Sequence, residues 1–214
     1  RRPRMERSER ASAATLEAVT DNAIRARGEA PISSSALTRD QIERRHIGQD
    51  IPMLLQGTPS LTAYSETGGP WGYSYIRLRG IDQSRINLSL DGIPLNDPED
   101  QVLYFADFPD LGNSIHSVQI LRGVGTSAPG TASYGGSINF QTIPLLTNAR
   151  GGEVQLQGGS FRSGRASAEY ATGLLPGGVT VYGRLSALQS QGYRHHSGTE
   201  GRSAFLAAAQ VGAR

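Results

Sequence analysis

The alternation of hydrophobic and polar residues changes twice along the chain. Residues 1–30 are polar and rich in arginine, alanine and serine, which predicts a flexible leader. Thr38 and Gln41 have the spacing of a capping box, which predicts a short helix at residues 39–45. Asp50 can cap a second helix of less than two turns.

A period of two begins after these helices. Hydrophobic and polar residues alternate in four short segments, which predicts strands near residues 75–79, 86–90, 118–122 and 138–142. Short helices followed by scattered strands are typical of a small α+β domain, which we place at residues 31–142. Pro144 and Asn148 interrupt the pattern, and residues 143–150 are therefore interpreted as a linker.

From residue 151 onward the alternation is longer and simpler. Segments of about ten residues with one hydrophobic and one polar face are typical of transmembrane β-strands. A soluble antiparallel sheet with one wet face has the same pattern. Residues 151–214 have room for about four strands, whereas a barrel that encloses a domain has about 22. If these are barrel strands, the chain is an N-terminal fragment with an incomplete transmembrane β-barrel.

Composition narrows the choice of function. The 27 glycines favour turn-rich β structure over helical bundles. All 21 basic residues are arginine, and five lie in the first ten positions without interleaved aromatic residues, so nucleic-acid binding is not expected. The absence of cysteine excludes a thiolate nucleophile, a cysteine zinc site and disulfides. No apolar run has the length of a signal-peptide core or of a membrane helix.

The sequence contains no recognisable catalytic motif. Residues 125–131 are similar to a phosphate-binding loop but lack the required lysine, and no G-x-S-x-G elbow is present. The histidine pair at 195–196 and the acidic group at 97–100 contain cation ligands, but neither spacing matches a known metal site. We therefore expect neither an enzyme nor a bound metal or cofactor.

Three segments stand out by their order and spacing. They are 76–80 (IRLRG), 86–97 (INLSLDGIPLND) and 115–142 (IHSVQILRGVGTSAPGTASYGGSINFQT). Together they resemble the plug domain of TonB-dependent outer-membrane receptors, and residues 32–61 and 159–172 fit the flanking parts of such receptors. The resemblance implies an α+β plug domain, with a small mixed sheet and short helices, followed by the first antiparallel strands of a transmembrane β-barrel.

The resemblance also gives roles to charged and terminal residues. It implies that Arg77, Arg79 and Arg122 pair with acidic groups of the barrel wall, and the alternative is that they are solvated strand charges. The TonB box of this family binds the periplasmic protein TonB by strand addition. The segment that resembles it consists of Leu16, Glu17, Ala18, Val19 and Thr20. Asp21 departs from the usual Thr-Ala ending, and an inert linker is the alternative.

In this family three plug loops face outward toward the ligand, and the matching segments are 64–73, 80–84 and 93–105. Exposed aromatic and polar side chains on loops held by a rigid sheet commonly build binding sites. Trp71 is the only tryptophan and the first expected contact, with packing of its loop onto the barrel wall as the alternative. The full set of expected ligand contacts is Trp71, Tyr73, Gln83, Asn96, Glu99, Asp100 and Tyr104.

The function implied by the resemblance is energy-coupled uptake of a scarce ligand, such as a ferric siderophore or cobalamin. The location would be the outer membrane of a Gram-negative bacterium. The partners would be TonB, a small molecule or metal chelate, and outer-membrane lipid. The alternative function is that of a soluble periplasmic or secreted binding or signalling domain with a plug-like fold.

Overall fold

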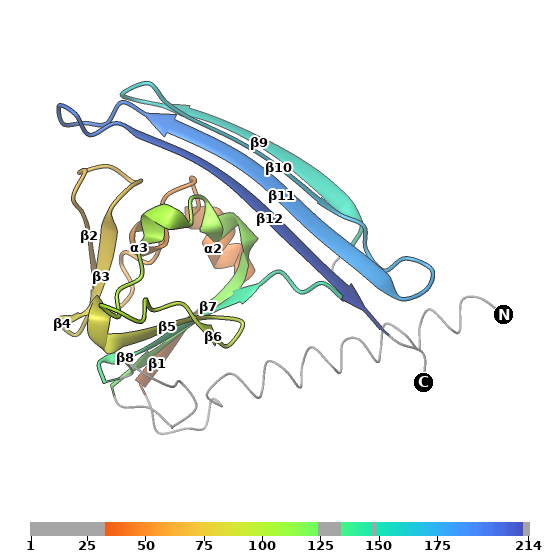
Figure 1. The fold of residues 1–214 in the computed structure, drawn as a ribbon, viewed down its shortest axis with the longest axis horizontal. Coiled ribbons are helices and arrows are strands. Elements are labelled where there is room, and N and C mark those ends of the chain that lie inside the picture. Colours follow the sequence, from red (N-terminus) through yellow and green to blue (C-terminus); the bar gives the residue numbers. More distant parts are fainter. Residues whose placement is uncertain (1–32, 124–133, 147–148, 212–214) are drawn as a thin grey trace.

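The structure is a computed structural model that describes residues 33–123, 134–146 and 149–211. Two layers face each other in it (Figure 1). One is an α+β domain within residues 33–146, which we call the N-terminal domain. The other is an antiparallel sheet of long strands within residues 149–211, which we call the C-terminal sheet.

A mixed sheet of five strands forms one side of the N-terminal domain. In spatial order its strands are β1 (Ser33–Leu37), β7 (Ile115–Arg122), β8 (Gly136–Thr142), β5 (Ile86–Leu90) and β6 (Ile93–Pro94). Neighbouring strands are antiparallel except β5 and β8, which are parallel. The mixed sheet and the short helices beside it confirm the predicted α+β class.

A smaller sheet and several short helices complete the domain. The sheet consists of β2 (Leu61–Ser65), β3 (Ser74–Leu78) and β4 (Ile81–Asp82). The helices are α2 (Arg39–Arg45), α3 (Ile51–Leu54), and the 3-10 helices η1 (Gln83–Arg85), η2 (Phe105–Asp107) and η3 (Leu111–Ser114). Helix α2 has the predicted bounds, and the Thr38 N–H donates to Gln41 Oε1 at 3.0 Å, as in a capping box.

The hydrophobic core lies between the helices and the two sheets of the N-terminal domain. Each strand turns alternate side chains inward, because successive residues point to opposite faces, and both α-helices contribute hydrophobic residues. The fully buried side chains include Ile42, Leu54, Leu55, Ile76, Leu78, Ile86, Leu88, Ile120, Ile138 and Phe140. One shared core therefore fixes the loops of the domain relative to one another.

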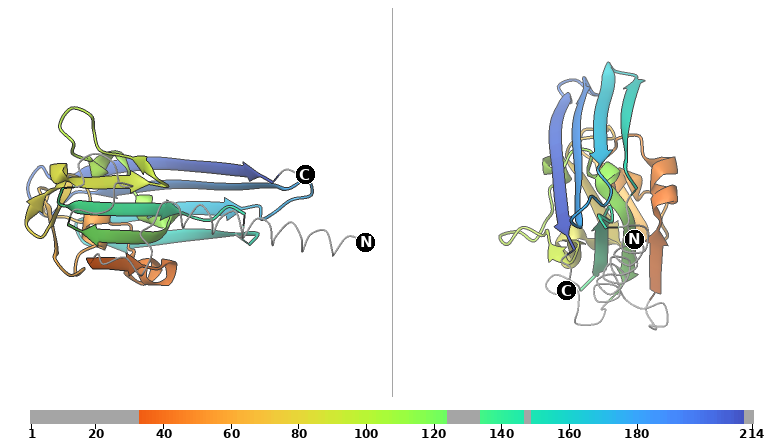
Figure 2. Two further views of the ribbon diagram at one scale, coloured as in Figure 1. Left: turned by 90° about the horizontal axis from the view of Figure 1, so that it is seen from below. Right: turned by 90° about the vertical axis from the view of Figure 1, so that its right-hand side faces the viewer.

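The C-terminal sheet is a meander with the spatial order β12-β11-β10-β9. Its strands are β9 (Gly151–Gly159), β10 (Ser163–Ala171), β11 (Val179–Ser190) and β12 (Thr199–Gln210). Buried and exposed residues alternate along β10 and β11, which confirms the predicted period of two. Figure 2 shows the four strands running along one side of the N-terminal domain.

The two faces of this sheet differ in chemistry. The face toward the N-terminal domain carries buried polar side chains such as Arg165, Arg184 and Ser186. The opposite face carries Leu185 and Leu206, which are 66% and 78% exposed. A polar face thus contacts the N-terminal domain and a hydrophobic face points away from it.

Two loops meet at one end of the molecule. The loop between β2 and β3 and the turn between β11 and β12 lie at the same end in Figure 1, and Arg194 Nη1 donates to Glu66 O at 3.1 Å.

No helix in the described ranges has the length and apolar character needed to cross a membrane.

Candidate functional site

The contact between the two layers is centred on Asp110. This residue precedes η3 with a left-handed backbone, φ 60°, which aspartate tolerates better than most residues. Two arginines from the inner face of the C-terminal sheet reach its carboxylate. Arg165 on β10 donates from Nε and Nη2 to the two carboxylate oxygens, at 2.9 and 2.8 Å. Arg184 on β11 donates from Nη1 to Oδ2 at 3.1 Å.

A histidine completes this group of side chains. His46 caps the C-terminal end of α2, and its Nε2 lies 3.3 Å from Asp110 Oδ1 without the geometry of a hydrogen bond. We call these four residues, Asp110, Arg165, Arg184 and His46, the Asp110 cluster. The cluster joins α2 and the segment before η3 to two neighbouring strands of the C-terminal sheet.

Both arginines have further hydrogen-bond partners. Arg165 Nη1 donates to Gln155 Oε1 on β9 at 2.9 Å, and Arg184 Nε donates to Ser114 Oγ of the N-terminal domain at 2.7 Å. Ser186 Oγ accepts a further hydrogen bond from Arg184 Nη1 at 3.2 Å. Burial of a charged group is tolerable when its polar atoms find such partners.

The charges of the cluster do not cancel. One carboxylate faces two guanidinium groups, and the three side chains are at most 2% exposed. Burial raises the pKa of Asp110, but the contacts with His46 and Arg165 outweigh burial and hold that pKa below its usual value. The carboxylate is therefore ionised, and its removal would leave Arg165 and Arg184 without the carboxylate to which both are bonded.

Glycines allow the two layers to approach closely beside the cluster. A Cβ atom on Gly48 would lie 2.2 Å from Cδ of Arg165, and Gly48 has a φ of +85°, which favours glycine. On the other side, a Cβ atom on Gly201 of β12 would lie 3.0 Å from Cβ of Pro109. The cluster is therefore flanked by two places where the backbone of one layer touches the other layer.

The β2–β3 loop is fastened to the segment between α2 and α3. Trp71 is 7% exposed, and its Nε1–H donates to Gly48 O at 2.6 Å. The Asp50 carboxylate accepts a hydrogen bond from Ser74 Oγ at 3.0 Å. Burial raises the pKa of Asp50 to about 7, although hydrogen bonds from Ser74 and the backbone of Gly72 act in the opposite direction.

Three of the expected ligand contacts support loops from within the domain. Trp71 is buried and bonded to Gly48. Gln83 is 1% exposed and accepts a hydrogen bond from Ile76 N at 3.2 Å. Asn96 fixes its turn by accepting from Leu88 N at 2.8 Å. For Trp71 and Gln83, direct contact with a ligand would require their loops to open.

The other four expected contacts lie toward the surface. Tyr73 is 53% exposed, and Glu99 and Asp100 are exposed on the turn after β6. Tyr104 Oη donates to Asp100 Oδ2 at 2.5 Å. This hydrogen bond raises the pKa of Tyr104 to about 12 and lowers the pKa of Asp100. The pair presents an aromatic ring and a carboxylate together, in a fixed geometry.

The three arginines expected to pair with the barrel wall lie outside the Asp110 cluster. Arg77 stands over the ring of Tyr64, with Cζ 5.8 Å from the ring centroid. Arg79 is exposed at the end of β3. Arg122 is buried and donates to Pro59 O at 3.1 Å and to two serine hydroxyls of β1. Pairing of these three arginines with other parts of a barrel wall stays a prediction.

In the described ranges, the ion pairs between the layers have the opposite arrangement of charges from the expected one. The carboxylate belongs to the N-terminal domain and the arginines to the C-terminal sheet. The sequence reasoning missed Asp110, Arg165 and Arg184. A signal was available for the arginines, since both occupy polar positions in strands with a two-residue alternation.

Two further expectations concern the leader and metal ions. The TonB-box-like residues Leu16, Glu17, Ala18, Val19 and Thr20 lie outside the described residues. Within the described ranges, no group of three or more histidine or acidic side chains is placed to hold a metal ion. Of these expected features, the structure therefore describes the loops that carry Tyr73 and Tyr104 but not the TonB-box-like segment.

Comparison with protein families identifies one matching family model. Residues 26–137, just over half of the chain, match the family described as TonB-dependent Receptor Plug Domain. No curated protein matches the chain.

Several solved structures share the fold. The ferric citrate transporter FecA, in its unliganded form, has a TM-score of 0.68 and 20% identity, over 84% of this chain and 28% of that chain. The siderophore receptor PirA from Pseudomonas aeruginosa has a TM-score of 0.58 and 19% identity, over 83% of this chain and 32% of that chain. FpvA from P. aeruginosa, solved with bound pyoverdines, has a TM-score of 0.58 and 21% identity, over 76% of this chain and 21% of that chain. The chain therefore spans about a fifth to a third of these proteins.

The Asp110 cluster yields a prediction for stability. Asp110→Asn removes the only carboxylate of the cluster, and leaving buried arginines unpaired costs about 3–5 kcal/mol. We expect a loss of this order in denaturant unfolding above about pH 5, because the stabilisation from a lowered pKa is lost only in acid. Glu200→Gln, in the exposed pair with Arg202, is the matched control and should leave stability unchanged. A neutral effect of Asp110→Asn would contradict the assigned role.

Asp50 yields a prediction for pH dependence. Its pKa in the folded chain, about 7, is above its usual 3.8, so its stabilising contribution is complete below about pH 4 and lost as pH rises through 7. Asp50→Asn should remove this dependence and make the protein more stable than wild type above pH 7, by up to roughly 4 kcal/mol. The exposed Asp107→Asn is the control and should keep the wild-type curve. Denaturant unfolding at a series of pH values measures both.

Proposed function

The chain belongs to the TonB-dependent receptor plug domain family, and on this premise we propose that it is part of an outer-membrane receptor for the uptake of a scarce ligand. One observation carries the proposal. An α+β domain is fastened through the Asp110 cluster to the polar face of a sheet whose other face is hydrophobic. In such a receptor the N-terminal domain is the plug and the C-terminal sheet is part of the barrel wall.

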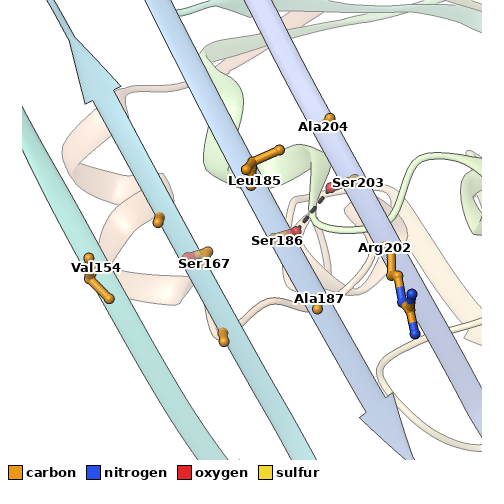
Figure 3. A pocket seen from close by; sticks show the side chains of 10 residues that line it. Val154, Ser167, Leu185, Ser186, Ala187, Arg202, Ser203 and Ala204 are labelled. Carbon is orange, nitrogen blue, oxygen red and sulfur yellow. Dashed lines mark hydrogen bonds between the residues drawn. The ribbon is translucent and has the colours of Figure 1, made fainter.

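The outward face of the C-terminal sheet has the composition expected for contact with lipid. Figure 3 shows part of this face, where a shallow groove of about 590 Å³ has Arg202 among its lining residues. A soluble monomer seldom exposes a large continuous hydrophobic patch. The exposed hydrophobic residues of this face include Val154, Leu156, Ala166, Ala168, Leu185, Ala187, Ala204 and Leu206.

The height of this hydrophobic face also fits a bilayer. From Val179 to Ala187 the outward positions of β11 carry no charge. This stretch is about 26 Å long at about 3.3 Å per residue. In a strand tilted by about 35–45° it crosses roughly 20 Å of the apolar band of membrane barrels, which is about 25 Å tall. The outward charged residues of β12, Glu200 and Arg202, pair with β11 at Gln189 and Ala187, at the edge of this band.

The polar contact between plug and wall suits a domain that has to move. Transport requires the plug to rearrange or leave its position, which exposes the surfaces that were in contact. Charged and hydroxyl groups such as those around Arg184 regain hydrogen bonds with water when they separate, whereas hydrophobic surfaces do not. The Asp110 cluster would thus hold the plug at rest and still permit its release.

We place the ligand contacts on the surface that carries Tyr73, Glu99, Asp100 and Tyr104. Aromatic rings and hydrogen-bonding groups on fixed loops can bind a large polar ligand. The buried Trp71 and Gln83, together with Asn96, position these loops from behind. Among the structures that share the fold are siderophore receptors and a ferric citrate transporter. This supports a ferric siderophore as the ligand, with cobalamin as a further candidate.

Energy for uptake would come from TonB in the periplasm. The segment 16–20, which resembles a TonB box, precedes β1 and would add as a strand to the TonB sheet. Ligand binding would favour the state in which this segment is accessible, a shift of populations between two states of the plug. The receptor would act without covalent chemistry, and its location would be the outer membrane of a Gram-negative bacterium.

Arginine substitutions test whether the C-terminal sheet faces lipid. Leu206→Arg places a charge opposite Gly183, in the middle of this band, which costs about 2–4 kcal/mol in a bilayer, whereas Gln189→Arg lies at the edge and costs about 0–1 kcal/mol. We expect the first variant of the complete receptor to unfold more readily from lipid vesicles and the second to resemble wild type. Equal tolerance of both would favour the soluble alternative.

Deletion of residues 16–20 tests the proposed coupling. The purified periplasmic domain of TonB should be retained by the immobilised receptor and lost after the deletion, because strand addition needs that segment. Deletion of residues 5–9, of equal length in the same leader, is the control and should not reduce binding. Unchanged retention after deletion of 16–20 would contradict this part of the proposal.

A further inference from the structure

The segment between α2 and α3 touches both the β2–β3 loop and the Asp110 cluster. It consists of five residues, His46, Ile47, Gly48, Gln49 and Asp50, and we call it the relay segment. His46 belongs to the Asp110 cluster through its contact with Asp110 at 3.3 Å. At the other end, the Asp50 N–H donates to Pro70 O of the loop at 2.9 Å.

Gly48 contacts the two sites at the same time. Its carbonyl oxygen accepts the indole N–H of Trp71 from the loop at 2.6 Å. Its Cα lies so close to Arg165 that an added Cβ would be 2.2 Å from Cδ of that side chain. Arg165 in turn makes two hydrogen bonds to Asp110. A displacement of Gly48 toward Trp71 or toward Arg165 therefore disturbs its contact with the other residue.

The relay segment is stiff enough to transmit such a displacement. Gln49 is 7% exposed, and both polar atoms of its side-chain amide bond to the backbone that precedes it. Its Oε1 accepts from Ile47 N at 2.6 Å, and its Nε2 donates to Arg45 O at 2.7 Å. The hydrogen bond from Ser74 to the Asp50 carboxylate fixes the far end to β3. Closely packed segments of this kind move as units because the interior has little free space.

We propose that the relay segment couples the position of the β2–β3 loop to the Asp110 cluster, with Gly48 and Asp50 as the positioning residues. A change that lifts Trp71 releases the carbonyl of Gly48 and frees Arg165 to shift from Asp110. By reciprocity, a change at Arg165 alters the stability of the loop to the same extent. The inference rests on the proposed function in one respect only, namely that a ligand bound at the β2–β3 loop is what moves the loop.

A second connection between loop and sheet has to be separated from the relay. Arg194, in the β11–β12 turn, donates to Glu66 O at 3.1 Å and so joins the loop directly to the C-terminal sheet. A signal could travel through this contact and along β11 to Arg184. Arg194→Gln removes this second route and leaves the relay segment unchanged.

Hydrogen exchange of the complete receptor in detergent, without ligand or TonB, tests the coupling in both directions. Trp71→Phe keeps a ring but removes the donor to Gly48, and Arg165→Lys keeps the charge but removes the paired hydrogen bonds. Trp71→Phe should speed exchange at residues 109–114, and Arg165→Lys should speed exchange at residues 66–73, each by roughly 2- to 30-fold. The protected amides that report these changes include Asn113, bonded to Asp110 O, and Glu66, bonded to Tyr73 O.

Control variants separate coupling through the relay segment from a general loosening of the fold and from the Arg194 route. Glu200→Gln removes an exposed ion pair with Arg202 from β12 and should change neither segment, which excludes a general loosening. In the Arg194→Gln background, Trp71→Phe should still act on residues 109–114. Loss of the effect in that background, or no effect of Trp71→Phe at all, would overturn the proposal. A double variant, Trp71→Phe with Arg165→Lys, should be non-additive, and additivity would also overturn it.

Failure of the coupling and failure of the proposed function give different results. The exchange experiment requires only a folded receptor, so a negative result leaves uptake through a TonB-dependent receptor intact. Conversely, a chain that neither enters lipid nor binds TonB can still show coupling between the loop and the Asp110 cluster.

Discussion

A buried carboxylate between two arginines is the constraint on which the arrangement of the layers depends. The side chains of Asp110, Arg165 and Arg184 are each at most 2% exposed, and a charge this deeply buried is costly unless it is paired. The pairing exists only when the segment before η3 lies against β10 and β11. The docking of the N-terminal domain is therefore determined by charge, while its hydrophobic core holds the domain itself together.

Several other features follow from this docking. The inner face of the C-terminal sheet is polar because it has to supply partners such as Ser186 and Gln155 to the arginines. Gly48 and Gly201 lack side chains where the two layers meet. The same docking brings the β2–β3 loop close to the β11–β12 turn, where Arg194 donates to Glu66 O.

The sequence predicted those features that depend on neighbours along the chain. Thr38 and Gln41 define the start of α2 locally, and the period of two defines β10 and β11. The Asp110 cluster was missed because Arg165 and Arg184 lie 55 and 74 residues from Asp110 along the chain, and no local pattern pairs residues so far apart. Trp71 was expected at a binding surface since loops often carry such residues, but it is buried and bonded to Gly48, from a different segment.

The most direct measurement of the docking uses two cysteines, since the chain contains none. Pro109→Cys and Gly201→Cys lie beside the cluster, where the corresponding Cβ atoms would be 3.0 Å apart, close enough for a disulfide after a small shift. If charge determines the docking, oxidation of the complete receptor should link the pair rapidly when Asp110 is present and much more slowly with Asp110→Ala. Equal rates in the two backgrounds, or free thiols in both, would contradict docking by charge.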